Sequence, residues 1–173
     1  MSDDQAEAAQ IAPADAEAFR NAMSRIAAAV HVVTTDGPAG RAGVTVTAMT
    51  PVSDAPATIL FCLNRASTFT PKLKQNGVFC INTLAAGAPS VALAEAFAGR
   101  TGLDQDDRFA QASWMDLATG SPVLHSAHGA LDCRVTEIRT VATHSVVFGE
   151  VLAIHSGATP EALVYLERTF RGL

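Results

Sequence analysis

The stretch that decides the fold is Gly40-Arg41-Ala42-Gly43-Val44-Thr45-Val46-Thr47-Ala48. Its alternation predicts a β-strand with one apolar face, which suits a core, and an opposite face that carries the hydroxyl groups of Thr45 and Thr47. A second apolar run, residues 57–63, stops at the polar segment Asn64-Arg65-Ala66-Ser67-Thr68. If the two strands are neighbours, the threonine face and this polar segment line one cleft.

Further strands are predicted on both sides of this stretch. The β-branched run at residues 30–35 and the turn at 36–40 form a hairpin with the threonine-bearing strand. Alternating apolar runs also predict strands at residues 77–84, 128–141, 145–154 and 163–170, the last of which closes the domain. Six or seven strands in hairpin-like succession with few helices favour a mainly β fold, a small antiparallel barrel.

Helices are expected at three places. Asp15 is a candidate N-cap for an amphipathic helix whose residues Phe19, Met23 and Ile26 recur at helical spacing and are expected to pack on the domain. Ser67 is expected to cap a short helix that ends at Asn76-Gly77, and Pro89 to begin one that ends at Gly99. Pro51 and Pro56 are expected to bracket a loop. The segment 100–122 is polar and irregular, with Phe109, Trp114 and Leu117 as apolar anchors.

Composition narrows the class of protein. At 173 residues and 49% hydrophobic content the chain fits one domain, which we place at residues 14–173 behind a disordered tail at residues 1–13. The chain has twelve Lys and Arg residues in total and a net charge of -5, which disfavours a nucleic-acid partner. No apolar run is long enough to span a membrane. The acidic start resembles no secretory signal, so a cytoplasmic location is expected.

The cysteines and histidines lack the spacing of a metal site. Cys62, Cys80 and Cys133 have no C-x-x-C pattern and fall in apolar runs, which is typical of buried free thiols in a reducing compartment. No metal is expected. The glycines at positions 37–43 do not form G-x-G-x-x-G, so a Rossmann dinucleotide fold is disfavoured.

His144 is the histidine that the pattern singles out, because it lies at the predicted turn between the two long strands, where a side chain can reach a ligand. Thr45, Thr47, Ser67 and Arg65 each have an ordinary structural explanation. Together they suit flavin mononucleotide (FMN), whose phosphate needs hydroxyl and N–H donors near a positive charge and whose ring edge needs polar partners.

Beyond these residues, longer stretches of the chain are similar to a known family. The matching residues run from about Phe19 to Leu173: Phe19-Arg20-Asn21-Ala22-Met23-Ser24, Val32-Val33-Thr34-Thr35, Gly43-Val44-Thr45-Val46-Thr47-Ala48, Pro51-Val52-Ser53, Cys62-Leu63-Asn64-Arg65, Asn82-Thr83-Leu84, Asp107-Arg108-Phe109, His144 and Phe148-Gly149. Through them the chain resembles the flavin reductase family with an FMN-binding split barrel, the small partner of two-component flavin monooxygenases. Residues 36–43 and 62–65 look most like the reductases that serve the pyrimidine-ring monooxygenase. Similar stretches occur in reductases of cob(II)yrinic acid a,c-diamide.

The resemblance implies an FMN-binding split β-barrel of Greek-key antiparallel topology, with FAD also possible. The flavin contacts it implies are Thr45, Val46, Thr47, Ala48, Cys62, Leu63, Asn64, Arg65, Ser67 and Thr68, with Phe97 and Ala98 near the ring or its phosphate end. It places His144, Tyr165 and Arg168 on the nicotinamide side. Many members carry Asp-His at the turn where this chain has Thr143-His144, so the histidine is interpreted as a positioning residue.

The activity that the resemblance implies is hydride transfer from NADH to FMN, with delivery of reduced flavin to a partner monooxygenase, by a homodimer. Two alternatives stay open. One is a corrinoid reductase of cobalamin synthesis with the same fold and flavin, and the other is a flavin-binding module without turnover. Genomic neighbours or corrinoid-dependent NADH oxidation would favour the first, and tight FMN retention without NADH oxidation would favour the second.

Overall fold

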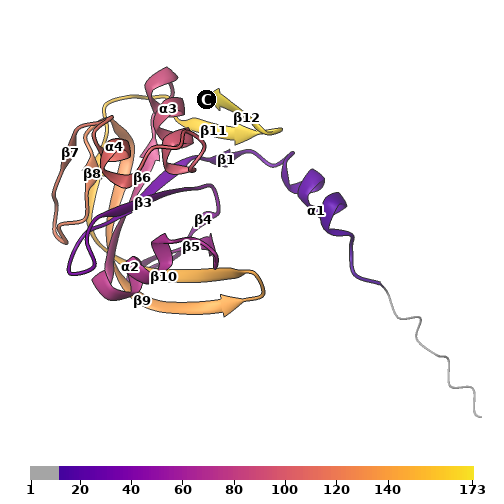
Figure 1. The fold of residues 1–173 in the computed structure, drawn as a ribbon, viewed down its shortest axis with the longest axis horizontal. Coiled ribbons are helices and arrows are strands. Elements are labelled where there is room, and N and C mark those ends of the chain that lie inside the picture. Colours follow the sequence, from indigo (N-terminus) through magenta and orange to yellow (C-terminus); the bar gives the residue numbers. More distant parts are fainter. Residues whose placement is uncertain (1–11) are drawn as a thin grey trace, which may run out of the picture.

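The computed structural model describes residues 12–173, and its largest sheet is a seven-stranded antiparallel barrel (Figure 1). In order of pairing, its strands are β3 (Ala42–Val46), β2 (His31–Thr35), β6 (Val78–Leu84), β9 (Ala127–Val141), β10 (His144–Ser156), β5 (Ala57–Asn64) and β4 (Met49–Asp54). β6 returns to pair with β2 after β4 and β5 have crossed to the far edge, which is a Greek-key connection. The edge strands β3 and β4 are joined by Thr47-Ala48 and do not pair, so the barrel is split there, and the predicted fold class is confirmed.

The C-terminal segment differs from the prediction. Residues 163–170 were expected to form one closing strand, but they form β11 (Leu163–Leu166) and the start of β12 (Thr169–Gly172). In a separate small sheet, β11 pairs with β1 (Ala28–Ala29) on one side and with β12 on the other. The turn between them holds Glu167 and Arg168 at φ 50° and 61°, the left-handed region that a two-residue hairpin turn requires. Neither residue is one that favours this region, so the sequence carried no turn signal.

Two hydrophobic clusters form the core. Inside the barrel, Phe61 and Phe79 meet edge to face with ring centroids 5.1 Å apart. Between the barrel, α3 (Ala88–Phe97) and α4 (Gln105–Phe109), the ring of Phe97 packs on Phe109 at 5.0 Å and on Trp114 at 6.0 Å. Phe109 and Trp114 therefore anchor the irregular segment 100–122, as their apolar character predicted.

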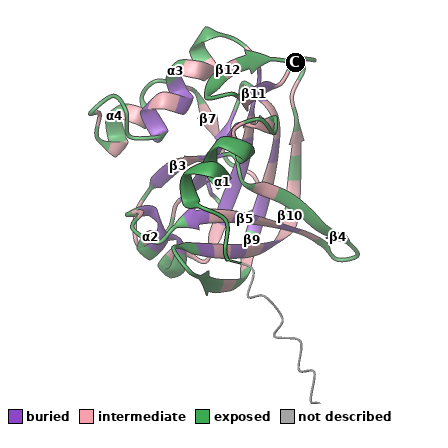
Figure 2. Cartoon of the chain, turned by 90° about the vertical axis from the view of Figure 1, so that its right-hand side faces the viewer, coloured by how far each residue is buried: buried purple, intermediate pink, exposed green. Residues whose placement is uncertain are grey.

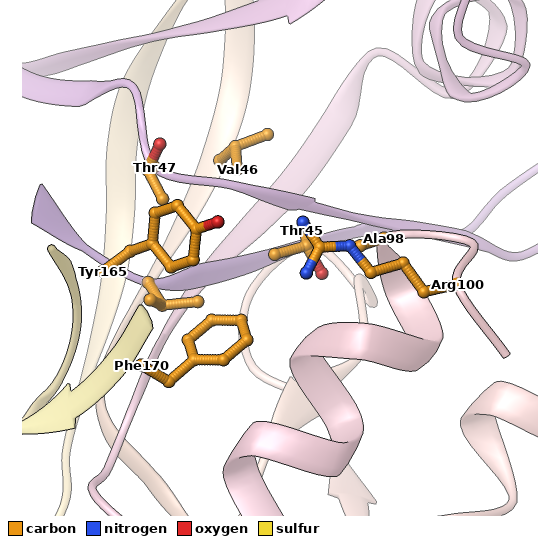
Figure 3. A pocket seen from close by; sticks show the side chains of 8 residues that line it. Thr45, Val46, Thr47, Ala98, Arg100, Tyr165 and Phe170 are labelled. Atoms are coloured by element: carbon orange, nitrogen blue, oxygen red, sulfur yellow. The ribbon is translucent and has the colours of Figure 1, made fainter. Parts of the chain in front are cut away.

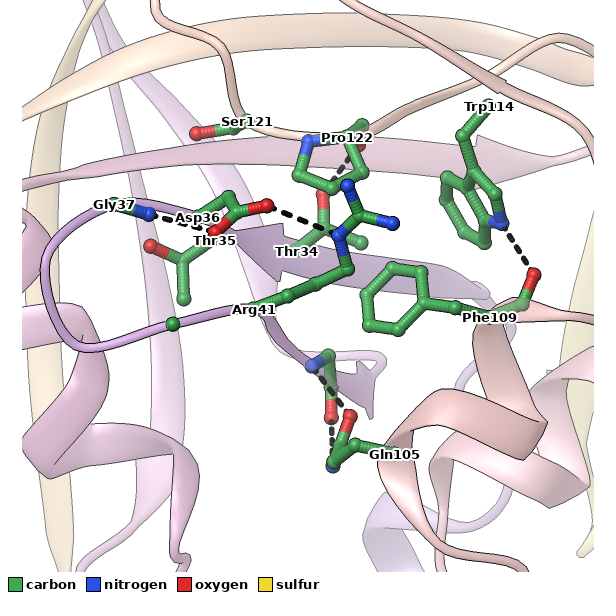
Figure 4. A network of polar contacts seen from close by, with 12 residues as sticks. Thr34, Thr35, Asp36, Gly37, Arg41, Gln105, Phe109, Trp114, Ser121 and Pro122 are labelled. Atoms are coloured by element: carbon green, nitrogen blue, oxygen red, sulfur yellow. Dashed lines mark hydrogen bonds and ion pairs between the residues drawn. The ribbon is translucent and has the colours of Figure 1, made fainter.

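Buried hydrogen bonds fix the rest of that segment. The side-chain amide of Asn82 donates to the carbonyl of Pro122 at 3.3 Å and accepts from the backbone N–H of Leu124 at 2.7 Å. The hydroxyl of Thr34 donates to the same Pro122 carbonyl at 2.5 Å (Figure 4). These bonds hold β8 (Val123–Leu124), which pairs with β7 (Trp114–Met115), against the barrel.

The first helix forms where it was predicted but does not pack as predicted. In α1 (Ala16–Met23) the Asp15 carboxylate accepts from the backbone N–H of Glu17 and of Ala18, both at 2.9 Å, so the N-cap is confirmed. None of its residues is buried, and the helix is exposed throughout (Figure 2). It is joined to the turn after β11 by the guanidinium of Arg168, which donates to the Asn21 side chain at 2.6 Å.

Two further differences are local. The expected loop between the prolines is β4, an edge strand, where a proline without an N–H is tolerated. α2 (Phe69–Asn76) ends at Gly77 with φ 69°, as expected. The residue at its N-cap position is Thr68, which makes no side-chain capping bond, and the hydroxyl oxygen of Ser67 accepts from the backbone N–H of Phe69 at 3.3 Å. Among residues 12–173 no helix has the length and apolar character to cross a membrane. The tail expected at residues 1–13 lies, apart from its last two residues, outside the described part of the chain.

Candidate functional site

β3 and the end of β5 line one open groove of about 600 Å³, as their sequences predicted. His144 stands at its rim, and the other polar lining residues are Thr45 of β3, Thr47 after it, Asn64 at the end of β5 and Ser67. Most of the expected flavin contacts meet in this groove: Thr45, Val46, Thr47, Ala48, Cys62, Leu63, Asn64 and Ser67. The split of the barrel between β3 and β4 is what opens this groove to solvent.

Thr45 of β3 and Thr47, which follows β3, differ in the hydrogen bonds that their hydroxyl groups make. The hydroxyl of Thr45 donates to the Ala94 carbonyl of α3 at 2.7 Å, so its proton is taken and only its lone pairs remain for a ligand. Thr47 is exposed, and its hydroxyl has no hydrogen-bond partner within residues 12–173. Thr47 is therefore the free hydroxyl donor of the pair.

His144 is presented by the turn between β9 and β10. It is the first residue of β10, opposite Asn64 of β5, and its Nδ1 lies 2.9 Å from the hydroxyl of Thr143. Arg65 secures this turn, because its backbone N–H donates to the Thr143 carbonyl at 3.1 Å and its guanidinium to the Ala142 carbonyl at 3.3 Å. Arg65 thus holds the turn, and it does not line the groove or the two cavities described next.

A second cavity of about 300 Å³ adjoins the groove, with which it shares Val44 and Ser67. Besides Ser67 it contains three predicted residues, Thr68, Phe97 and Ala98, together with Gln105 and Arg108, for which no role was predicted. The amide of Gln105 accepts from the backbone N–H of Gly43 at 3.0 Å and donates to its carbonyl at 3.2 Å (Figure 4). The Nε of Arg108 donates to the Leu103 carbonyl at 2.8 Å.

A third cavity of about 200 Å³ also adjoins β3 and shares Thr45, Val46 and Thr47 with the groove. Tyr165 and Phe170 form one wall, with ring centroids 5.1 Å apart, and Arg100 extends toward Thr45 from the end of α3 (Figure 3). Tyr165 therefore faces a different cavity from His144. Arg168, expected beside them, lies at the β11–β12 turn, where it bonds α1, and lines none of the three cavities.

The three cysteines fall into two environments. Cys80 and Cys133 are fully buried, and burial together with the nearby Asp132 carboxylate raises the pKa of both thiols, that of Cys133 to about 12. Cys62 was also expected to be buried, but it is half-buried and forms part of the groove. Its position on β5, one residue before Leu63 of the core, turns its side chain to the opposite face.

The shape and chemistry of the groove fit a flavin ring. Val46 and Leu63 are apolar and suit a flat aromatic system, whereas Thr47 and Asn64 offer polar groups to a ring edge. The adjoining cavity with its guanidinium gives a phosphate-bearing side chain room beside the ring. The donor set is therefore compatible with FMN.

Comparison with known proteins agrees with this assignment. A family model described as "Flavin reductase like domain" matches residues 23–173. A protein of Methylorubrum extorquens named "FMN reductase (NADH) RutF 1" is 48% identical over 161 residues, 93% of this chain and 78% of that protein. The protein named "FMN reductase (NADH) RutF" of Escherichia coli is 44% identical over 92% of this chain and 94% of its own.

A solved structure shares the fold. BorF, the flavin reductase component of a bacterial two-component tryptophan halogenase, is 29% identical and superposes with a TM-score of 0.83 over 92% of this chain and 98% of its own. The split barrel, the groove beside β3 and the matched family model lead to one conclusion: the chain belongs to the family of proteins with a flavin reductase-like domain.

Proposed function

We propose that this protein is an NADH-dependent FMN reductase that supplies reduced flavin to a separate monooxygenase. The observation that carries the proposal is the groove between β3 and β5, which gathers eight of the expected flavin contacts with His144 at its rim. The names of the curated relatives, FMN reductase (NADH), support the choice of FMN and NADH. BorF, a reductase component of a two-component system, supports delivery of the product to a second enzyme.

The reaction needs positioning rather than a nucleophile. NADH supplies a hydride at C4 and FMN accepts it at N5, which requires the two rings to lie face to face at about 3–3.5 Å. Thr47 and Asn64 hold the edge of the flavin ring, and Val46 and Leu63 support its apolar part. His144, fixed by the turn that Arg65 secures, positions the nicotinamide, and water supplies the proton that completes flavin reduction.

We also propose a cellular location and an oligomeric state for the enzyme. Three free cysteines and the use of NADH fit a reducing cytoplasm. A homodimer is proposed by analogy with the family, and the exposed apolar side chains of Phe19 and Met23 in α1, with Ile26 just after it, are available to a second subunit.

Anaerobic stopped-flow absorbance of the purified protein with FMN and NADH tests the proposal. Rapid bleaching of the flavin band, with many equivalents of free FMN reduced per protein, is the expected result. The same mixture with a corrinoid acceptor is the second arm, and electrons that pass mainly to cobalt would replace the proposed acceptor with a corrinoid. No bleaching in either arm would leave a flavin-binding module and overturn the proposal.

A further inference from the structure

We propose that Thr143 is a positioning residue of the reductase: its hydroxyl donates to Nδ1 of His144, so that an uncharged ring offers Nε2–H to the nicotinamide. The proposal rests on the proposed function, because it specifies how the histidine at the rim of the groove binds NADH. Thr143 lines none of the three cavities, and it acts through His144.

The turn that carries Thr143 is tied at both of its residues. Ala142 and Thr143 alone link β9 to β10, since Val141 and His144 are paired across the ladder. The carbonyl of Ala142 accepts from the Arg65 guanidinium at 3.3 Å, and that of Thr143 accepts from the Arg65 backbone N–H at 3.1 Å. The hydroxyl of Thr143 is therefore held beside the imidazole ring, although both side chains are exposed.

The bond between Thr143 and His144 leaves one ring nitrogen for a ligand. Nδ1 lies 2.9 Å from the hydroxyl, which makes no other side-chain hydrogen bond within residues 12–173, and Nε2 has no partner in that range. A neutral imidazole has one N–H and one bare nitrogen, and a hydroxyl can turn its single proton toward the bare one. With Thr143 as the donor, the hydroxyl proton and the Nδ1 lone pair are both satisfied, and the ring proton is on Nε2.

The charge of the His144 ring matters for hydride transfer. Loss of the hydride leaves the nicotinamide ring positively charged, so an imidazolium beside it would oppose the reaction. A neutral N–H donor can bind the carboxamide oxygen without that repulsion. A carboxylate in place of the Thr143 hydroxyl would accept from Nδ1–H and favour the imidazolium. Threonine at this position therefore favours the neutral donor.

No carboxylate in the described part of the groove replaces that partner. The residues opposite His144 in the ladders, Val141 and Asn64, are uncharged. Among residues 12–173 the groove is lined by no acidic side chain and by one other titratable group, the Cys62 thiol. The charged side chains on the flanking elements are already bound, Arg65 by the turn, and Glu137 and Arg139 of β9 by each other.

Nuclear magnetic resonance of the flavin-free protein with 15N-labelled histidine tests where the proton lies. The His144 signals are identified by their loss in His144→Ala, and the shift of each ring nitrogen shows whether it is protonated. Above neutral pH the wild type and Thr143→Ser should carry the proton on Nε2, and Thr143→Asp should move it to Nδ1. A wild-type ring protonated on Nδ1, or an unchanged ring in Thr143→Asp, would overturn the proposal.

Steady-state kinetics test the role in NADH binding. Thr143→Val keeps the shape of the side chain but loses the hydroxyl, and it should raise the KM for NADH about two- to fivefold, the worth of one exposed hydrogen bond. The dissociation constant of FMN should not change, and Thr143→Ser should keep the wild-type KM. The matched control Thr140→Val removes an exposed threonine of β9. An unchanged KM in Thr143→Val, or an equal rise in Thr140→Val, would refute the role.

The pH dependence of hydride transfer tests the charge of the ring. In stopped-flow experiments the rate in Thr143→Asp should fall on acidification at a pH about one unit above that of the wild type, because the carboxylate favours the imidazolium. Coincident pH profiles for the two proteins would contradict the proposal.

These tests separate the proposal from the proposed function. If the resonance experiment finds the proton on Nε2 but NADH fails to bleach FMN, the reductase proposal fails and the hydrogen bond from Thr143 stands. If NADH reduces FMN while the wild-type proton is on Nδ1, or while Thr143→Val keeps its KM, the reductase proposal stands and the role of Thr143 fails.

Discussion

A fall in pH from 7 to 4 should remove about 3 kcal/mol from the free energy of unfolding through one side chain, His31. This histidine is only 2% exposed in β2, with its Nδ1 3.0 Å from the hydroxyl of Thr83, and burial lowers its pKa from 6.5 to about 4. Between these two values the unfolded chain binds one more proton than the folded chain, so stability falls as the pH falls through this window and levels off below it. At about 1.4 kcal/mol for each pH unit the whole window is worth about 3.5 kcal/mol, of which about 3 kcal/mol is lost by pH 4.

Urea denaturation followed by circular dichroism at pH 7, 6 and 5 measures the effect before most carboxylates are protonated. Over that range the contribution of His31 is about 2 kcal/mol. The double variant His31→Val/Thr83→Val removes both partners of the hydrogen bond and should lose that much less stability on acidification than the wild type. The control variant His125→Gln removes an exposed histidine, so it shows the effect of losing a histidine that is not buried. An equal loss in the double variant and the wild type would refute the reasoning.

Three other predictions concern the groove and the second cavity that adjoins it. His144→Ala should raise the KM for NADH more than it weakens FMN binding, and steady-state kinetics with an unchanged KM would remove the positioning role. Cys62 should be the one cysteine that a maleimide labels in the native protein, with FMN slowing the reaction, as peptide mass mapping would show; prompt labelling of a second thiol would contradict this. Gly43→Ala should cost about 1–3 kcal/mol of unfolding free energy in urea denaturation, because its Cβ would overlap the Phe97 ring. In the control Gly129→Ala the nearest atom to the added Cβ is 3.6 Å away, and equal losses in the two variants would refute the clash.

The alternation of β3 and the apolar run of β5 predicted both the barrel and the groove, because a strand with one polar face must place that face toward solvent or a ligand. The C-terminal hairpin could not be predicted, since Glu167 and Arg168 adopt left-handed conformations that only the assembled sheet stabilises. In α1 the sequence predicted the element but not its packing. Its amphipathic pattern predicted a helix correctly, but the pattern does not say what the apolar side chains contact: Phe19 borders the groove, and both Phe19 and Met23 stay largely exposed.

The part of the site that could be predicted consists of polar residues that lie close together in the sequence. Thr45 to Ala48 and Cys62 to Ser67 come from two stretches, and their residue types suggested a common cleft. Arg108 and Gln105 lie in the irregular segment after α3, where no periodicity indicates which side chains face the barrel. The triplet Asp107-Arg108-Phe109 was part of the family resemblance and was the one signal that pointed to this segment. Arg65 carried the expected charge in the expected loop, but its guanidinium donates to the Ala142 carbonyl and it lines none of the three cavities.

The contact between Gln105 and Gly43 also bears on aggregation. β3 is an edge strand, and the outward-facing N–H and carbonyl of Gly43 are the groups that an incoming strand from another molecule would pair with. The side-chain amide of Gln105 accepts from this N–H and donates to this carbonyl, as one residue of a neighbouring strand would. One of the two unpaired edges of the split barrel thus has a residue whose pairing groups are already occupied by a side-chain amide.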